Sequence, residues 1–436
     1  MEFPEYKKNI VVLGGGFGGL QAALRLGKFI RRAGLGGKYS VVLVDKHPRH
    51  IFTPLLYEVA TTSEASLPAG KRNTIAHELE PLVAYPLKEL LESSGVEFHL
   101  DEVRRLDILE GVAHLKTGKL DYEYLVIALG SETNYFDIPG LAAHGLPLKT
   151  FEDALAIRER LDPRVGENKG LTRVVIGGAG STGVELAGEI REWSCARPYT
   201  KTCNIHVTLV ESGHNILGAM DARVQAKATA RLKKLRVQIF TEERVVRVDT
   251  REIHLKSGEH ILHDIFIWTG GVRAVPLTEE LPMKREGKGR IEITSGMECL
   301  PIGEDLRVAG NIYAVGDIAC LYDPETKQPS PWMARPAMMG ARCAAKNIIE
   351  RIKFAEGISR AIKTHTYRVP DYPYIVPVGG KYAVAKIGPF VISGFLAWVF
   401  KGIVELNYFL SIMPWWRALS VWLRGFLLFI KNDRMG

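Results

Sequence analysis

Residues 9–20, NIVVLGGGFGGL, decide the fold of the first part of the chain, and residues 172–190, TRVVIGGAGSTGVELAGEI, repeat the same plan. Each stretch begins with an apolar, β-branched run, passes through a glycine cluster and continues into a helical pattern. A strand, a tight turn and a helix in this order form the first part of a β-α-β unit. The sequence therefore predicts two copies of one supersecondary motif.

A second strand completes each unit. YSVVLVDK at 39–46 contains Asp45 at the end of its apolar run, and IHVTLVES at 205–212 contains Glu211 at the corresponding place. Further short apolar runs that lead into glycine lie at 124–130, 265–270 and 311–317. Alternating strands and helices are typical of parallel, doubly wound sheets. The predicted fold class is α/β, with two Rossmann-like dinucleotide-binding domains.

The glycine turns predict phosphate binding. A pyrophosphate needs backbone N–H donors at close range, so the turn must lack side chains and open onto a helix N-terminus. The first turn supplies Gly14, Gly16 and Gly19, with Gly15 and Gly18 in addition, and the second supplies Gly178, Gly180 and Gly183. An acid at the end of the next strand accepts hydrogen bonds from the ribose hydroxyls of a dinucleotide. Two such units predict two bound dinucleotides.

The acid of the second unit also predicts which cofactor is preferred. Glu211 would repel a 2′-phosphate, and no arginine follows it in ESGHN at 211–215. We therefore expect the second site to prefer NADH to NADPH.

Length and composition limit the other classes of protein. A chain of 436 residues predicts two to four domains, and 46% hydrophobic with 24% charged residues excludes general disorder. The net charge of +8 is too mild to indicate nucleic-acid binding. Such an excess fits an anionic membrane surface, an anionic ligand or simply a solvated surface.

The five cysteines show neither C-x-x-C nor metal-ligand spacing, which predicts free thiols in a reducing compartment. The histidines show no ligand spacing, so they are interpreted as surface or structural residues and no metal is expected. MEFPEYKKN at 1–9 carries two glutamates before the first apolar run and fits no signal or transit peptide. A cytoplasmic start is therefore expected.

The last part of the chain is apolar and aromatic, and four of the seven tryptophans lie in its final 39 residues. Its longest uncharged stretch, 387–400, is shorter than the ~20 residues of a membrane-spanning helix, so no simple span is predicted. Within 415–431 three basic residues share a stripe opposite an apolar side, formed by Trp415, Leu419, Trp422, Leu423, Phe426 and Ile430. This pattern is typical of a helix lying in a membrane surface, and docking on the protein or on a partner subunit is the alternative.

Several segments resemble the type II NADH:quinone oxidoreductases, which are single-subunit, membrane-associated flavoproteins. These segments are GGGFGGL at 14–20, VDKHPRHIFTPLLYEVAT at 44–61, YLVIALGSETNYFDIPG at 124–140, GGAGSTGVELAGEI at 177–190 and YAVGDIA at 313–319. The resemblance covers nearly the whole chain except 64–84, which looks like an insertion. It implies FAD in the first domain, NADH in the second, and reduction of a membrane quinone without proton pumping.

The resemblance also implies the FAD contacts. They are Gly14, Gly15, Gly16, Phe17, Gly18, Asp45, Lys46, Pro54, Val103, Ala128, Gly130 and Asp317. Asp317 has the alternative of capping a helix. Val103 would act through its backbone, and Pro54 would shape the loop beside the flavin ring.

Glu185 is the side chain expected to act in catalysis, because the family carries a glutamate here, near the nicotinamide and the flavin. Glu189 and Glu192 follow on the same helix, and the alternative for all three is that they are solvated helix charges. Hydride transfer needs no protein acid, since the cofactors carry that chemistry. Supplying a proton to a reduced quinone does need one.

One departure from the family concerns the quinone motif A-Q-x-A-x-Q of bacterial members. This chain reads Ala334, Arg335, Pro336, Ala337, Met338, Met339, so both glutamines are replaced. Arg335 would still bond a ring carbonyl. The methionines would form either a soft apolar wall or part of a helix core.

Two other classes of function compete with this one. One is a related flavoprotein reductase with another acceptor, such as a protein carrier or a sulfide:quinone type. The absence of cysteine from the first 194 residues counts against a disulfide reductase. The other is a non-catalytic redox sensor that binds both nucleotides.

The domains are predicted at 1–165 and 296–365 for FAD, with the NADH domain inserted at 166–295 and a membrane-association region at 366–436. The expected location is the cytoplasmic face of the cell membrane, as a peripheral protein of a respiratory chain. A homodimer is left open.

Overall fold

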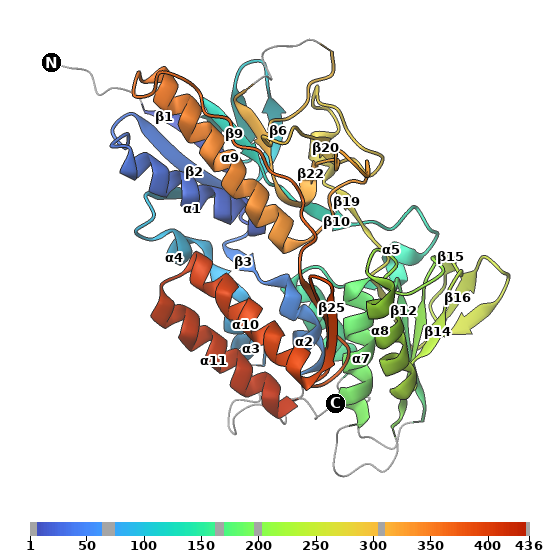
Figure 1. The fold of residues 1–436 in the computed structure, drawn as a ribbon. Coiled ribbons are helices and arrows are strands. Elements are labelled where there is room, and N and C mark those ends of the chain that lie inside the picture. Colours follow the sequence, from blue (N-terminus) through green and yellow to red (C-terminus); the bar gives the residue numbers. More distant parts are fainter. Residues whose placement is uncertain (1–6, 63–74, 162–169, 196–202, 304–309, 433–436) are drawn as a thin grey trace. The chain divides into compact units, whose positions relative to one another are not determined.

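The computed structural model describes residues 7–62, 75–161, 170–195, 203–303 and 310–432 (Figure 1). The chain divides into two compact units, each assembled from three separate segments. Unit 1 comprises Met1–His50, Tyr85–Glu132 and Arg273–Pro370, and unit 2 comprises Ile51–Ala84, Thr133–Val272 and Asp371–Gly436. The two units are the compact parts of the fold, and compactness does not test where the FAD and NADH domains begin and end. The domain boundaries near residues 165, 295 and 365 therefore stay a prediction.

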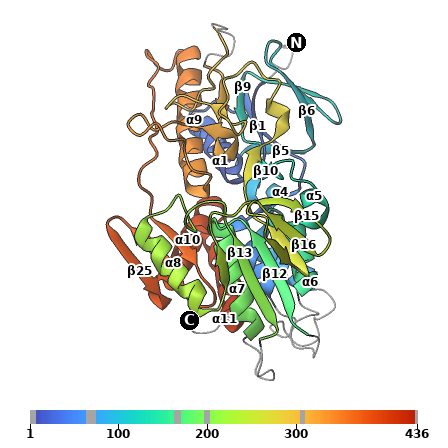
Figure 2. The same ribbon diagram turned by 90° about the vertical axis from the view of Figure 1, so that its right-hand side faces the viewer.

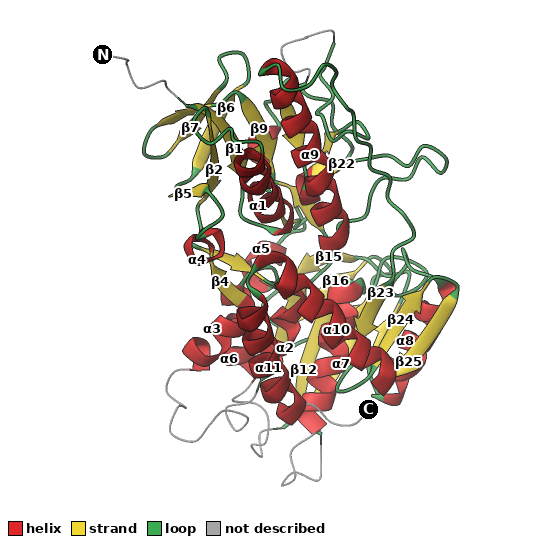
Figure 3. Ribbon diagram, turned by 60° about the vertical axis from the view of Figure 1, so that its left-hand side comes forward, coloured by secondary structure: helices red, strands yellow, loops and turns green. Residues whose placement is uncertain are grey.

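Unit 1 is built on a five-stranded parallel sheet of order β21-β9-β1-β2-β5. The side chains of Ile10, Val11, Val12 and Leu13 in the middle strand are fully buried, as expected of a parallel sheet covered on both faces. Helices α1 and α9 run side by side along it (Figures 1 and 3). The bounds are β1 Lys8–Leu13, β2 Tyr39–Asp45, β5 Val96–Leu100, β9 Tyr124–Ile127, β21 Ile312–Ala314, α1 Phe17–Arg32 and α9 Ala334–Ala355.

A three-stranded antiparallel sheet, β6-β7-β8, extends unit 1. Its strands are β6 Val103–Asp107, β7 Val112–Leu115 and β8 Lys119–Asp121. The smaller elements of unit 1 are α4 Leu87–Leu91, η5 Pro276–Thr278, β20 Ile291–Glu292, η7 Gly316–Ile318 and β22 Ala319–Cys320. Four short strands lie where the chain passes from one unit to the other, β3 Arg49–Ile51, β4 Ala84–Pro86, β10 Ser131–Thr133 and β19 Val272–Ala274.

Unit 2 repeats the plan with a parallel sheet of order β11-β18-β12-β13-β14 (Figure 2). Phe266 and Trp268 of this sheet pack with Val245, Val248 and Ile253 of an antiparallel sheet, β15-β16-β17. The bounds are β11 Leu146–Pro147, β12 Thr172–Gly177, β13 Ile205–Val210, β14 Gln238–Phe240, β18 Ile265–Trp268, β15 Val245–Val248, β16 Glu252–Leu255, β17 His260–Leu262, α7 Ser181–Cys195 and α8 Ala222–Lys234.

The remaining helices of unit 2 come from all three of its segments. The early segment supplies η1 Thr53–Leu55, α2 Leu56–Thr61 and α3 Ile75–Val83, and the middle segment α5 Leu141–His144 and α6 Phe151–Leu161. The last segment forms the antiparallel sheet β23 Tyr374–Pro377, β24 Ala383–Ile387, β25 Phe390–Gly394 and the adjacent helices α10 Phe395–Ile412 and α11 Trp415–Asn432 (Figure 1).

The predicted fold class is confirmed, because both glycine turns join a parallel strand to a helix. In each unit the strand with the turn is flanked by the strand that ends in the acid, β1 by β2 and β12 by β13. The cysteine prediction is wrong in one respect. Cys195 and Cys203 form a disulfide, whereas Cys299, Cys320 and Cys343 are free and buried. The separation of eight residues matches neither C-x-x-C nor a metal-ligand spacing, so the sequence did not reveal this pair.

Candidate functional site

The first glycine turn has the geometry that a bound pyrophosphate requires. Gly14 has a φ of +102°, and a Cβ there would collide with the carbonyl of Ala128. A Cβ on Gly19 would collide with the carbonyl of Gly14, so this glycine allows α1 to pack closely against its strand. Gly16 faces open space, with nothing within 4 Å of a Cβ position. Gly14 therefore allows the tight turn, Gly16 leaves the backbone accessible to a phosphate, and Gly19 allows the helix to pack closely on the strand.

The acid after the second strand is tied to this turn. The carboxylate of Asp45 accepts hydrogen bonds from the backbone N–H of Gly15 at 2.5 Å and of His47 at 2.7 Å. Lys46 beside it is exposed. Asp45 thus lies at the carboxyl edge of the sheet, where a ribose would meet it.

His50 also supports the turn, a role that the sequence did not reveal. The side chain is 1% exposed, and Nδ1 lies 2.8 Å from the carbonyl oxygen of Gly15. Burial lowers the pKa of His50 to about 4, so the ring is neutral at pH 7 and donates from Nδ1. Phe17 packs edge-on against this ring with centroids 5.1 Å apart. The only signal in the sequence was the position of His50 within 44–61.

The carboxyl ends of β1, β9 and β21 in unit 1 meet at the first glycine turn. A Cβ on Gly18 would lie 3.2 Å from Val315 and 3.3 Å from the backbone nitrogen of Gly316. Asp317 lies in the short helix η7 and accepts a hydrogen bond from the hydroxyl of Ser131 at 2.7 Å. The predicted contacts Gly14 to Gly18, Ala128 and Asp317 therefore converge at the carboxyl edge of the sheet.

The other predicted contacts are spread more widely. Gly130 has a φ of +74° just after β9, and Val103 begins β6 with a half-buried side chain. Pro54 lies in η1, is exposed and belongs to unit 2. Ala334 begins α9.

The altered quinone motif forms the first turn of α9. Arg335 is exposed there, while Pro336 and Ala337 are buried. Met338 is half-buried and Met339 is 36% exposed, with its sulfur 3.7 Å from Arg342 Nη1. Neither methionine belongs to the helix core, which favours the apolar-wall alternative of the two that the sequence left open.

The second turn, in unit 2, repeats the geometry of the first. Gly178 has a φ of +97°, a Cβ on Gly183 would collide with the Gly178 carbonyl, and Gly180 faces open space. The carboxylate of Glu211 accepts from the backbone N–H of Ala179 at 2.7 Å and of Gly213 at 2.8 Å. Asp45 and Glu211 therefore hold the second residue of their turns in the same way. This agreement between two independent segments is the main evidence for two nucleotide sites.

Glu185 lies one turn into α7, beyond the second glycine loop, and it is enclosed by protein with only a small part of its surface exposed. Mainly because of burial, the pKa of Glu185 is raised to about 8; Lys401 opposes the rise and Glu58 adds to it. The carboxyl group is therefore mostly protonated at pH 7. A buried acid with a pKa near the working pH is suited to proton donation.

The neighbours of Glu185 form a buried charge cluster that sequence reasoning missed. We use this name for Glu58 of α2 and Lys401 and Glu405 of α10, together with Glu185 of α7. Lys401 Nζ lies 2.5 Å from Glu58 Oε1 and 2.9 Å from Glu405 Oε1, and Tyr57 donates to Glu58 Oε1 at 2.8 Å. Glu58 Oε2 is buried and accepts no hydrogen bond.

The titration of the cluster follows from these contacts. Burial alone would lower the pKa of Lys401, but Glu405 and Glu58 outweigh it and hold the pKa above its ordinary value. Burial raises the pKa of Glu405, and Lys401 only partly offsets this. Two carboxyl groups, those of Glu58 and Glu405, thus share one buried ammonium. Glu58 lies in the motif FTPLLYEVA, yet nothing in the sequence pairs it with a lysine more than 340 residues later.

The other two acids of α7 have structural contacts. Glu189 is 3% exposed and accepts from the backbone N–H of Gly380 at 3.2 Å. Glu192 pairs with the buried guanidinium of Arg231. The alternative that all three acids of α7 are solvated charges is therefore wrong.

The C-terminal helix α11 divides its apolar residues between two stripes. Ala418 is fully buried, Trp422 Nε1 donates to the Gly402 carbonyl at 2.8 Å, and Phe426 packs against Trp398, so this stripe docks on α10. The second stripe is exposed and consists of Trp415, Leu419, Leu423 and Leu427. Docking is therefore confirmed for one stripe, whereas the exposed stripe leaves the membrane-surface alternative as a prediction.

Helix α10 is, by length and composition, apolar enough to cross a membrane. This differs from the prediction that no simple span exists, because the helix extends past the uncharged stretch to include Lys401 and Glu405. Length and composition alone are weak evidence. Both charged residues are paired inside unit 2.

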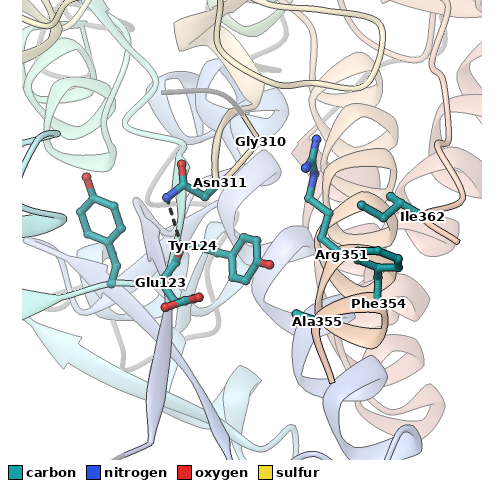
Figure 4. A pocket seen from close by; sticks show the side chains of 9 residues that line it. Glu123, Tyr124, Gly310, Asn311, Arg351, Phe354, Ala355 and Ile362 are labelled. Atoms are coloured by element: carbon teal, nitrogen blue, oxygen red, sulfur yellow. Dashed lines mark hydrogen bonds between the residues drawn. The ribbon is translucent and has the colours of Figure 1, made fainter. Parts of the chain in front are cut away.

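A shallow hollow in unit 1 lies away from the nucleotide edge (Figure 4). Its lining includes Glu123, Tyr124, Asn311 and Arg351, and Asn311 donates to the Glu123 carbonyl at 3.4 Å. Tyr124 begins β9, so the hollow is at the amino edge of the parallel sheet. Ligands of such sheets bind at the carboxyl edge, and we assign this hollow no role.

Comparison with known proteins agrees with this geometry. The chain belongs to the pyridine nucleotide-disulphide oxidoreductase family, whose model matches residues 8–347. Within that family its relatives include the type II NADH:quinone oxidoreductase Ndh of Mycobacterium tuberculosis, which is 29% identical over 97% of this chain and 89% of its own. The demethylphylloquinone reductase NdbB of Synechocystis is 30% identical over 71% of this chain and 72% of its own. The resemblance predicted from the motifs is confirmed.

Solved structures share the fold. NDH2 from Plasmodium falciparum, solved in complex with NADH, superposes with a TM-score of 0.77 at 17% identity, covering 97% of this chain and 98% of its own. The sulfide:quinone oxidoreductase of Aquifex aeolicus gives 0.74 at 18% identity, covering 95% and 92%. At these identities the likeness concerns the fold.

Proposed function

We propose that the chain is an FAD-dependent NADH:quinone oxidoreductase that passes two electrons from NADH to a membrane quinone without pumping protons. The observation that carries the proposal is the pair of glycine turns of equal geometry, each with its acid bound to the turn. Named relatives that reduce quinones support the acceptor class. Bound FAD supplies the redox chemistry, which is hydride acceptance from NADH followed by two-electron delivery to a quinone.

The residues present fit these cofactors. Gly16 and Gly180 leave their backbones open where a pyrophosphate would approach, and a side chain at Gly14 or Gly178 would collide with the neighbouring strand end. We propose that the first turn, with Asp45, Lys46, Gly130, Val103, Ala128 and Asp317, holds FAD. The second, with Glu211, holds NADH. The role of Pro54, which belongs to unit 2, stays a prediction from the resemblance. Ala334 and Arg335 lie at the first turn of α9, where we place the quinone contact.

The chain itself contributes a proton. Quinone reduction by NADH consumes one proton beyond the transferred hydride, and this proton ends on a quinone oxygen. Glu185, with a pKa of about 8, carries such a proton at pH 7. We propose that Glu185 donates it and that Lys401 keeps the pKa from rising higher, so that the carboxyl still releases its proton near neutral pH. The carboxyl then takes up a new proton from solvent.

A sulfide-oxidising function, suggested by one structural neighbour, is less well supported. It needs a reactive cysteine, and a reactive cysteine has a lowered thiol pKa. Burial instead raises the pKa of Cys343 to about 11, and it also raises the pKa values of Cys299 and Cys320. The three free thiols are therefore poor nucleophiles.

A panel of donors and acceptors tests the proposed function. The purified protein is expected to oxidise NADH in steady state with ubiquinone or menaquinone analogues, whereas sulfide should not replace NADH as the donor. NADH oxidation with a protein carrier but not with quinones would support the carrier alternative. Nucleotide binding without turnover would support the redox sensor.

Glu211→Arg is expected to shift the preference from NADH toward NADPH. The carboxylate at the end of β13 repels a 2′-phosphate, and an arginine there would attract it. The ratio of kcat/KM for the two nucleotides should change by about tenfold or more, and each tenfold corresponds to about 1.4 kcal/mol. Asp264→Arg, at a carboxylate outside the glycine turn, is the control. An unchanged ratio in Glu211→Arg would mean that the ribose is recognised elsewhere.

We propose that the protein is peripheral at the cytoplasmic face of the cell membrane. The exposed stripe of α11 carries tryptophan and leucine beside Arg417 and Arg424, as in helices that lie in a membrane surface. Protease access in inside-out and right-side-out vesicles tests the side, and light scattering tests for a homodimer.

Replacing the four residues of the exposed stripe by serine should release the protein from anionic vesicles in flotation assays. NADH oxidation with a soluble acceptor should persist, because the docked stripe keeps Trp422 and Phe426. The control replaces four scattered exposed leucines, Leu100, Leu109, Leu171 and Leu262, and should still bind. Truncation near residue 390 is a poorer test, since it removes Lys401 from the buried charge cluster.

A further inference from the structure

The antiparallel sheet of unit 2 brings together two histidines that show no ligand spacing in the sequence. His254 of β16 and His260 of β17 stand directly opposite each other in the register of the hairpin. Their rings meet edge to face with centroids 4.5 Å apart. The interpretation of the histidines as merely surface or structural residues thus misses a cross-strand pair.

Carboxylates complete the group. Glu252 precedes His254 by two residues and therefore shares its face of the strand. Its Oε1 lies 2.9 Å from Nδ1 of His260, and one ligand atom from each of the three residues lies within 4.8 Å of the others. Asp249 adds a second carboxylate, with Oδ2 at 2.7 Å from Nε2 of His254.

Two imidazoles with a carboxylate are a typical ligand set for zinc. Bonds of about 2.0–2.2 Å in a tetrahedron require ligand atoms about 3–3.5 Å apart, a spacing that small side-chain rotations would reach here. The side chains of His254, Glu252 and His260 are 23%, 37% and 51% exposed, so a metal ion can enter from solvent and keep a water ligand. Imidazole ligands favour Zn²⁺, Ni²⁺ or Cu²⁺ over Mg²⁺ and Ca²⁺.

The matching sheet of unit 1 shows that the fold does not require this pair. Strand β7 reads VAHL where β16 reads EIHL, so His114 corresponds to His254. Lys119 stands opposite His114, at the place that His260 takes opposite His254. An arginine faces the histidine from the neighbouring strand in both units, Arg105 in unit 1 and Arg247 in unit 2, where Arg247 pairs with Asp249. The same hairpin is thus compatible with a lysine in place of the second histidine, and of the two hairpins only that of unit 2 pairs two histidines.

We propose that Glu252, His254 and His260 bind one divalent transition-metal ion of the Zn²⁺ class on the β16-β17 hairpin, with Asp249 orienting His254. A carboxylate that contacts a metal-bound imidazole fixes the ring and strengthens binding. The site is separate from the glycine turn of unit 2 and does not depend on the proposed oxidoreductase function.

The test uses the full-length protein without a polyhistidine tag, stripped with a chelator. Wild type should bind one equivalent of Zn²⁺ in equilibrium dialysis, and Co²⁺ should give the visible absorption of a tetrahedral site. His260→Lys copies the arrangement of unit 1 and should weaken binding at least about tenfold. Glu252→Gln should also weaken it. His114→Ala is the matched control and should leave binding unchanged.

Several results would overturn the proposal. They are the absence of a stoichiometric site in wild type, binding that survives both His260→Lys and Glu252→Gln, or an equal loss in His114→Ala. Far-ultraviolet circular dichroism of each variant checks that a loss of metal is not a loss of fold. Because His260 is half exposed and lysine occurs at the equivalent place in unit 1, the fold is expected to persist.

Discussion

Lys401→Met is expected to destabilise the folded protein by about 3–5 kcal/mol, because it leaves Glu58 and Glu405 buried without their shared cation. Methionine keeps most of the length and the apolar character of the lysine stem, so the loss of stability reports the removal of the charge. Glu58 Oε2 already accepts no hydrogen bond, and the variant would remove the ion pair at Oε1 as well. Chemical denaturation followed by circular dichroism measures the effect.

The stability of Lys401→Met should depend on pH in a direction that can be predicted. Burial raises the pKa of Glu405 and Lys401 opposes that rise, so removal of Lys401 should raise the folded-state pKa of Glu405 further. Stability should therefore fall as the pH rises above the unfolded-state pKa of Glu405, since the proton uptake that relieves the burial is lost. Lys386→Met, which breaks a pair with the largely exposed Asp371, is the control and should change stability little. An equally small loss in Lys401→Met would contradict the buried charge cluster.

Glu185→Gln is expected to lower quinone-dependent turnover by about 10²-fold or more, the range of a lost general acid. Reduction of the flavin by NADH should remain rapid, because hydride transfer uses no protein acid. Single-turnover kinetics of the two half-reactions separates these steps. Glu152→Gln, at an exposed acid in the first turn of α6, is the control and should behave as wild type.

The pH profile distinguishes proton donation from a structural role. A donor must be protonated, so wild-type quinone reduction should decline as the pH rises past the pKa of about 8, and the variant should lose this limb. The contribution of Glu185 to stability should also fall with rising pH. The folded pKa of Glu185 lies above its ordinary value, so its contribution to stability is lost as the pH rises from 4.5 to 8. The variant should therefore be more stable than wild type above pH 8. Normal turnover would remove Glu185 from the mechanism.

Sequence patterns predicted the features that depend on residues lying close together in the chain. Within each unit the glycine turn, the strand that follows it and the acid lie within about 40 residues, from Gly14 to Asp45 and from Gly178 to Glu211, and the structure places them as expected. Helix α11 was predicted from its 3.6-residue period, and only the division of its apolar side into two stripes was missed. That division depends on α10, which no periodicity in α11 reveals.

Long-range contacts escaped prediction. Glu58 meets Lys401, and His254 meets His260, only after strands and helices have set the register. In the sequence alone, Glu58 is interpreted as an ordinary helix acid and Lys401 as a cation of an amphipathic helix. His254 and His260 are interpreted as surface histidines. The buried cluster and the histidine pair therefore required the fold, whereas the nucleotide turns did not.

The most direct test of the central claim is an anaerobic titration of the purified holoprotein. Addition of NADH should bleach the flavin absorbance rapidly, and subsequent addition of a ubiquinone or menaquinone analogue should restore it. Bleaching and recovery together would establish both halves of the reaction and the class of acceptor. Absence of bleaching by NADH, or bleaching that no quinone reverses, would contradict the NADH:quinone oxidoreductase proposed here.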